Sequence, residues 1–229
     1  MSALVVVQDL VKTFGAGLTE TPVLRGLTLT LQAGELSALL GPSGSGKSTL
    51  LTILGTLMQP TSGAHQMLGQ DMVRATDSAR TAFRNQHIGF VFQFHNLLPD
   101  FTALENVIFP AAIRAGRETG VARARGMDLL TRMGLQDRIH FPTAHLSGGQ
   151  KQRVSLARAL AAKPDVLICD EVTSALDTVV ATAILDLIDN LRRDFGIATV
   201  FISHDISTAR AFCDDIMVLY AGRVVELTS

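Results

Sequence analysis

The stretch GPSGSGKS, from Gly41 to Ser48, has the spacing of a phosphate-binding loop, G-x-x-x-x-G-K-[ST]. Glycines allow backbone N–H groups to approach phosphate oxygens, and the N-terminus of the following helix adds a positive dipole. Lys47 would place its charge on the β and γ phosphates, and the Ser48 hydroxyl could bind Mg²⁺. A glycine-rich turn that only caps a helix is the alternative. The loop lies between an apolar strand and an apolar helix, which favours phosphate binding.

A second element that could do chemistry is VLICDE, from Val166 to Glu171. An apolar strand that ends in acids places its carboxylates at the edge of a parallel sheet, beside a phosphate loop. There Asp170 could hold Mg²⁺, and Glu171 could act as a general base or orient the attacking water. Acids at a strand end can also serve only as helix caps. The position of the motif after the phosphate loop favours catalysis.

The pentapeptide LSGGQ, from Leu146 to Gln150, could bind a second anion. Ser147 is suited to cap a helix, and Gly148 and Gly149 leave backbone N–H groups bare for an anion. A plain capped helix would explain Ser-Gly-Gly, but not this pentapeptide just upstream of VLICDE. The sequence therefore has two separate helix starts that could bind phosphate.

The elements that must position these motifs alternate between strand and helix at both ends of the chain. Residues 27–40 predict two strands around a turn at Gln32–Gly34, and the closing residues predict a hairpin that turns at Ala221 and Gly222. Further strands are expected within residues 84–93, 166–172 and 198–205. Helices are expected after the phosphate loop and within residues 103–116, 118–135, 147–162 and 175–195. An α/β core with an inserted helical subdomain follows from this order.

Composition and charge describe an ordinary folded chain of 229 residues, of which 47% are hydrophobic. The net charge of −1 excludes an overall basic field that would attract nucleic acid. Cys169 and Cys213 have no metal-ligand spacing, and we expect buried, apolar roles for them in a reducing compartment. The first residues do not resemble a signal peptide, and no apolar run approaches the roughly 20 residues of a membrane span. These features predict a cytoplasmic chain.

The motifs GPSGSGKST, LSGGQ, VLICDE, SALD and ISHD, in that order, resemble the nucleotide-binding subunit of ABC transporters. The resemblance covers essentially the whole chain. It implies a Mg-dependent ATPase with a RecA-like phosphate-loop core, an antiparallel β subdomain and an inserted α-helical subdomain. The core is then expected at about 1–93 and 163–229, and the helical subdomain at about 94–162, within one ATP-binding domain. It also implies a homodimer in which ATP lies between the phosphate loop of one subunit and the LSGGQ of the other.

The resemblance also assigns roles to single residues. Phe14 matches the aromatic that stacks on adenine, although a core role is the alternative. Gln93 matches the glutamine that senses Mg²⁺ and the attacking water and that links the core to the helical subdomain. Asp177 matches the aspartate that communicates across the dimer, and His204 the histidine that contacts the γ-phosphate. The implied catalytic residues are Lys47, Gln93, Glu171 and His204, and the implied Mg²⁺ ligands are Ser48, Gln93 and Asp170. The implied ATP-binding residues are Phe14, Gly41, Pro42, Ser43, Gly44, Ser45, Gly46, Lys47, Ser48, Thr49, Ser147, Gly148, Gly149, Gln150 and Asp177.

Within the family, the segment RNQHIGFVFQFHNLLPDFTALENV is similar to the ATPase of lipoprotein-releasing (Lol) systems of Gram-negative bacteria. Macrolide-exporter and cell-division ATPases are its wider relatives. This resemblance implies a peripheral protein at the cytoplasmic face of the inner membrane, bound to permease subunits. The region from Gln93 to Val107 is expected to contact the permease, although packing within the subdomain would also explain its apolar residues.

The second half of the sequence departs from the Lol pattern. EVTSALD replaces a continuation with Pro-Thr-Gly-Asn-Leu-Asp, and LSGGQ replaces LSGGE. From Leu146 onward the chain is more similar to the ATPases of dipeptide and oligopeptide importers. An importer subunit for peptides or other solutes, or a cell-division regulator, therefore remains an alternative to lipoprotein release.

Overall fold

A six-stranded sheet organises the centre of the computed structural model, which describes residues 3–174, 176–203 and 205–228. The strand order is β10-β9-β3-β8-β7-β6, and all neighbouring pairs are parallel except the β9–β10 hairpin. Its short, apolar central strands are typical of a sheet that is covered on both faces. The strands are β3 (Leu36–Leu40), β6 (Ile88–Val91), β7 (Val166–Asp170), β8 (Ala198–Ile202), β9 (Asp215–Tyr220) and β10 (Arg223–Thr228).

A second, antiparallel sheet is built from the first third of the chain, in the order β2-β1-β4-β5. Its strands are β1 (Ala3–Phe14), β2 (Thr21–Gln32), β4 (Ser62–Met67) and β5 (Gln70–Asp71). The predicted pair of strands around Gln32–Gly34 is present, but β2 and β3 belong to different sheets. The turn therefore passes the chain from one sheet to the other.

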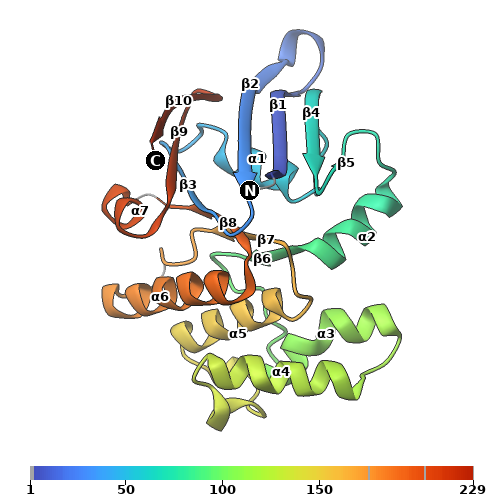
Figure 1. Cartoon of the computed structure of the whole chain (residues 1–229), viewed down its shortest axis with the longest axis vertical. Coiled ribbons are helices and arrows are strands. Elements are labelled where there is room, and N and C mark those ends of the chain that lie inside the picture. Colours follow the sequence, from blue (N-terminus) through green and yellow to red (C-terminus); the bar gives the residue numbers. More distant parts are fainter. Residues whose placement is uncertain (1–2, 175, 204, 229) are drawn as a thin grey trace.

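Three α-helices, α3 (Ala103–Ala115), α4 (Gly120–Arg132) and α5 (Gly148–Leu160), lie together at the end of the molecule opposite the antiparallel sheet (Figure 1). Each begins at a threonine or serine whose side chain accepts a backbone N–H, as N-caps do. The remaining helices are α1 (Lys47–Leu54), α2 (Asp77–His87), α6 (Thr178–Phe195) and α7 (Ile206–Phe212), with short 3-10 turns at Gly17–Thr19, Gln136–Arg138 and Thr143–His145.

The core divides into two large apolar clusters on opposite faces of the parallel sheet, as the alternation along β7 shows. Leu167 and Cys169 face a cluster that also contains residues of α3, α4, α5 and α6. Val166 and Ile168 face a cluster that joins the sheet to α1 and to the antiparallel sheet. Both cysteines are free; Cys169 is buried and Cys213 half-buried. The helices α3, α4 and α5 thus share their apolar interior with one face of the parallel sheet.

The predicted strand within residues 84–93 is shorter than expected. Residues 84–87 complete α2, where Phe83 packs into the core and Arg84 donates to the carbonyl of Thr56 at 2.9 Å. Only Ile88–Val91 pair with β7. The polar run RNQH suits a half-exposed helical turn better than a buried parallel strand, which explains the difference.

His65 makes the fold sensitive to acid. It lies on β4, is 2% exposed, and its Nε2 has no hydrogen-bond partner among the described residues. Burial lowers its pKa to about 4, while Asp71 acts in the opposite direction. Because the unfolded chain binds the proton first, this stability is present above the unfolded pKa of about 6.5 and is lost as the pH falls toward 4.

We therefore expect the free energy of unfolding to fall by about 2 kcal/mol between about pH 7.5 and about pH 5 because of this group alone. Urea unfolding of the natural protein and of His65→Leu at both pH values measures the effect. The substitution should remove that part of the pH dependence. An identical pH dependence in the two proteins would contradict the buried, neutral state of His65.

Candidate functional site

The phosphate loop connects β3 to α1 at the carboxyl edge of the parallel sheet. The Lys47 side chain folds back over this loop, and its Nζ donates to the carbonyls of Gly41 at 2.7 Å and Pro42 at 2.9 Å. Ser45 is buried, and its hydroxyl has no hydrogen-bond partner among the described residues. A buried ammonium and an unsatisfied hydroxyl at the start of a helix fit a bound phosphate group.

The two acids of VLICDE end the strand β7, which is separated from β3 only by β8. Burial lowers the pKa of Lys47, while the charges of Glu171 and Asp170 oppose that shift. The lysine and both carboxylates are therefore close enough to interact electrostatically. The order of the strands brings together two motifs that lie more than a hundred residues apart in the sequence.

Glu171 has a strained backbone, with φ at 49° in the left-handed region. For a residue with a Cβ this conformation is unfavourable, and such residues gather at functional sites. The turn that follows stabilises it, because Ser174 donates to the Glu171 carbonyl from its backbone N–H at 3.1 Å and from its hydroxyl at 2.9 Å. The local structure thus fixes the direction in which this carboxylate leaves the strand.

Gln93 follows β6, the strand beside β7, so it lies at the same edge of the sheet as Asp170. It is half-buried. His204 follows β8 in the sequence but lies outside the residues that the structure describes. The phosphate loop, the acid pair and Gln93 therefore lie at the same edge of the sheet, at the ends of three different strands.

The LSGGQ motif begins α5. Ser147 and Gln150 form a capping box, in which the Gln150 N–H donates to the Ser147 hydroxyl at 3.3 Å and the Ser147 N–H to Gln150 Oε1 at 2.9 Å. Asp177 caps the neighbouring helix α6 by accepting the N–H of Val180 at 3.0 Å. Within the described part of the chain, no hydrogen bond or ion pair joins residues 146–150 to the phosphate loop. The two helix starts that were predicted to bind phosphate are therefore not joined by these contacts within one subunit.

Phe14 is the last residue of β1 and is 40% exposed. The Lys12 ammonium lies 5.1 Å from the centre of its ring and donates to the carbonyl of Gln59 at 2.9 Å. An exposed aromatic face beside a cation can accept a flat heterocycle. Adenine stacking stays a prediction, and the core role is less favoured by this exposure.

The candidate Mg²⁺ ligands do not form a protein-only metal centre. Among the described residues no three His, Cys, Asp or Glu side chains come together as a metal site. Mg²⁺ beside a nucleotide usually has only one or two protein ligands, and phosphate oxygens and waters complete its shell. The hydroxyl of Ser48, at the start of α1, and the carboxylate of Asp170 fit that kind of site.

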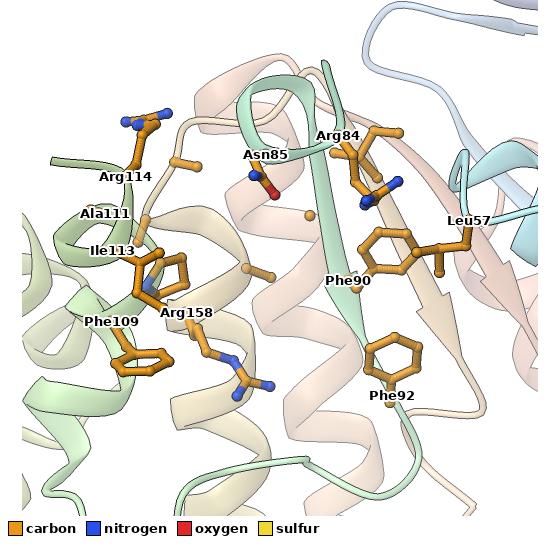
Figure 2. A pocket seen from close by; sticks show the side chains of 16 residues that line it. Leu57, Arg84, Asn85, Phe90, Phe92, Phe109, Ala111, Ile113, Arg114 and Arg158 are labelled. Atoms are coloured by element: carbon orange, nitrogen blue, oxygen red, sulfur yellow. The ribbon is translucent and has the colours of Figure 1, made fainter. Parts of the chain in front are cut away.

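Sequence reasoning missed a groove between the parallel sheet and the helical end, with a volume of about 560 Å³ (Figure 2). The stacked rings of Phe90 and Phe92, 5.5 Å apart, form one wall. The opposite wall contains residues of α3, and of the described residues that line the groove none is acidic, whereas three are arginines: Arg84, Arg114 and Arg158. The only sequence signal for it was the apolar run IGFVF, which is longer than its strand.

None of the described residues in the predicted permease-contacting region, Gln93 to Val107, lines this groove. Leu104 and Val107 are buried in the apolar cluster of the helices. Phe94 is 73% exposed, and Phe101 stacks edge-on against Phe109, a residue of the groove. The alternative of packing within the subdomain therefore accounts for much of the segment.

A phosphate loop, an acid pair and a glutamine on one edge of a parallel sheet define a phosphate-loop nucleoside triphosphatase. A family model described as "ABC transporter" matches residues 24–174. The chain belongs to the ABC transporter family, as an ATP-binding ATPase.

Proteins of known sequence and structure resemble nearly the whole chain. The lipoprotein-releasing system ATP-binding protein LolD 1 of Caulobacter vibrioides is 49% identical over 226 residues, 99% of this chain and 96% of that protein. The macrolide export ATP-binding/permease protein MacB of Syntrophobacter fumaroxidans is 44% identical over 90% of this chain but only 29% of its own length. The ATP-binding cassette MJ0796, solved as a dimer in a post-hydrolysis state with ADP and Pi, has a TM-score of 0.88 at 36% identity and covers 98% of both chains.

These similarities confirm the predicted family, the fold class and the ATPase class. The boundaries at 93 and 163, and the roles of the individual site residues, stay predictions. No helix in the described part of the chain is long and apolar enough to cross a membrane.

Proposed function

We propose that this chain is the Mg-ATPase subunit of a Lol-type transporter that releases lipoproteins from the bacterial inner membrane. The observation that carries the proposal is the 49% identity to a lipoprotein-releasing ATP-binding protein over 226 residues. That match extends through the second half of the chain, where the motifs are similar to those of peptide importers. The absence of a membrane-spanning helix among the described residues is consistent with a peripheral subunit at the cytoplasmic face.

In this proposal the phosphate loop binds the nucleotide. Lys47 exchanges its two loop carbonyls for the β and γ phosphate oxygens, and backbone N–H groups of residues 41–49 surround them. Ser48 and Asp170 hold Mg²⁺, which supplies charge neutralisation on the phosphates when bound. The exposed ring of Phe14 stacks on the adenine.

Hydrolysis then depends on positioning a water molecule for in-line attack. Glu171 accepts a proton from that water or orients it, and Gln93 holds it from the neighbouring strand. His204 is assigned to the γ-phosphate by the family motif alone, since it lies outside the described residues. Core and helical subdomain, at about 1–93 with 163–229 and about 94–162, move relative to each other during the cycle.

A second copy of the chain completes each site. Ser147, Gly148, Gly149 and Gln150 of one subunit bind the phosphates held by the other, and Asp177 lies beside the contact between the subunits. The separation of LSGGQ from the phosphate loop within one chain and the dimeric state of the related cassette support this homodimer.

The groove of Figure 2 is the proposed docking surface for the permease. Its aromatic and aliphatic walls suit the apolar face of a short helix, and its three arginines favour an occupant with a carboxylate. It lies between the Gln93 edge of the sheet and α3, so an occupant contacts both the core and the helical end.

Ile113→Glu should separate docking from catalysis. Ile113 is 65% exposed in the groove, so the substitution leaves the fold intact, but it places a carboxylate against the apolar face of the occupant and competes with the occupant's own carboxylate for the groove arginines. We expect the isolated subunit to keep its ATPase rate and its affinity for the membrane subunits to fall about tenfold or more. Co-purification in mild detergent measures this. Val121→Glu, at an 82% exposed position on α4 outside the groove, is the matched control.

The cargo is tested with the membrane proteins that co-purify with the chain. Reconstituted with them in vesicles that contain a lipoprotein, the complex should release it in an ATP-dependent manner. An ATPase that releases no lipoprotein but takes up peptides, exports macrolides or activates a cell-wall hydrolase would contradict the Lol-type assignment.

A further inference from the structure

The segment 93–98, here called the strap, joins the end of β6 to the helical end of the molecule and begins with Gln93. The end of the strap at Gln93 follows Phe92, whose ring stacks on that of Phe90 in β6 and fixes this end to the core. At its far side, Asn106 of α3 accepts the N–H of Leu98 at 2.8 Å and donates to its carbonyl at 3.0 Å. Between these points, the hydrogen bonds to the strap from other described elements come from α5, and Leu97 packs against the apolar cluster of the helices.

Arg158 supplies the first contact between the strap and α5. One end of its guanidinium donates to the carbonyl of Asn96 at 2.6 Å and the other to the carbonyl of His95 at 2.8 Å. Figure 2 shows its side chain extending from α5 into the space between Phe109 and Phe92. Burial lowers the pKa of Arg158, which nevertheless stays charged at neutral pH. A fork on two successive carbonyls fixes both the position and the direction of the strap.

His95 supplies the second contact, at the opposite end of α5. Its ring lies close to the backbone of Gly148 in the LSGGQ motif and to Lys151; burial and the Lys151 charge lower the pKa of His95, and the Gly148 backbone opposes them. Asn96 has φ at 49°, a left-handed conformation that turns the chain between the two contacts. The strap is thus hydrogen-bonded near the end of α5 and lies close to its start, where the glycines of LSGGQ are.

We infer that Arg158 is a positioning residue that couples Gln93 to the LSGGQ motif of its own subunit, with His95 as the second point of attachment. The inference rests on the proposed function, because it concerns how a subunit that holds ATP presents its motif to the other copy. A shift of Gln93 moves the strap, and the two contacts transmit that shift to α5 as a rigid element. Arg158 also lines the docking groove, so a permease bound there acts on the same link.

The test separates nucleotide binding from assembly. In a Glu171→Gln background, the ATP-driven dimer is measured by sedimentation, and ATP affinity is measured with a fluorescent ATP analogue at protein concentrations too low for dimers. Arg158→Ala should bind the analogue within about twofold of the parent, because the phosphate loop is intact, but its dimerisation should weaken about tenfold or more. Arg158→Lys should fall between the two, since an ammonium keeps the charge but loses the fork.

Arg125→Ala is the matched control. Arg125 also donates to two successive carbonyls, those of Leu160 at 2.7 Å and Ala161 at 2.9 Å, but both lie at the end of α5. It should dimerise like the parent. Equal dimerisation of Arg158→Ala and the parent, equal losses in the two alanine variants, or a matching loss of analogue affinity would overturn the inference.

Two further outcomes are decisive. If Arg158→Ala does not fold, as judged by circular dichroism, Arg158→Lys alone must show weakened dimerisation with normal analogue affinity, and dimerisation like that of the parent would overturn the coupling. A parent that binds no analogue or forms no dimer with ATP would overturn the proposed function itself, and the inference with it.

Discussion

Glu171→Gln should lose at least about a hundredfold in ATP turnover while it still binds ATP, and it should accumulate as a dimer. A general base contributes about 10²–10⁴ to a rate, and an amide of the same shape cannot accept the proton. The strained backbone at this position holds the side chain in place, so the substitution changes chemistry rather than geometry. Phosphate release at saturating ATP and sedimentation with and without ATP provide the two measurements.

The control for this variant is Glu118→Gln, which removes a charge from the exposed pair with Arg123 in the helical end. It should turn over ATP at the rate of the natural protein, and its sedimentation with and without ATP should match that of the natural protein. Natural turnover in Glu171→Gln would refute the role assigned to Glu171. Lost ATP binding in that variant would show instead that the carboxylate supports the nucleotide site.

Gly41→Ala should destroy the phosphate loop. A Cβ at this position would lie 2.1 Å from the carbonyl oxygen of Leu219 and 2.9 Å from Ser45 Oγ, and φ is +146°, which side chains rarely adopt. The first of these atoms is backbone of β9 and cannot move alone. We expect a loss of about 2 kcal/mol or more in the free energy of unfolding, together with loss of ATP binding. Urea unfolding and binding of a fluorescent ATP analogue measure the two effects.

Gly26→Ala is the control for Gly41→Ala, because it introduces the strain of a positive φ without a steric clash of the added Cβ. Gly26 has φ at +76° but no heavy atom within 4 Å of an added Cβ, so only the cost of the left-handed conformation, about 1–2 kcal/mol, remains. This variant should keep its affinity for ATP. Unchanged ATP binding in Gly41→Ala would mean that the loop tolerates a shift of β9.

Much of the site could be predicted from the sequence because its chemistry depends on local motifs. Lys47 and Ser48 are defined by the spacing of the loop, and Asp170 by an apolar strand that ends in acids. The edge that unites them follows from the rule that ligands bind at the carboxyl ends of parallel strands. The helix start at Ser147 was equally readable, because a capping residue is a local signal, whereas α6 was expected from Ala175 and is capped instead by Asp177.

The groove and the strap contacts could not be predicted in the same way. The fork from Arg158 to the carbonyls of His95 and Asn96 joins residues more than sixty positions apart, and neither carbonyl has a sequence signature. The helical turn at residues 84–87 was assigned to a strand because apolar residues follow it directly. For the groove and the strap contacts, tertiary packing rather than local preference decides the outcome, whereas the polarity of RNQH was a local signal for the helical turn.

The two faces of β7 have a consequence for how the molecule unfolds. Leu167 and Cys169 belong to the same apolar cluster as the helices α3, α4 and α5, whereas Val166 and Ile168 join the sheet to α1 and β1. The helical end therefore has no interior of its own that could survive without the sheet. Melting of those helices would expose one face of β7 to water, so the helices and the sheet should denature as a single cooperative unit, even with the relative motion that the proposed cycle requires.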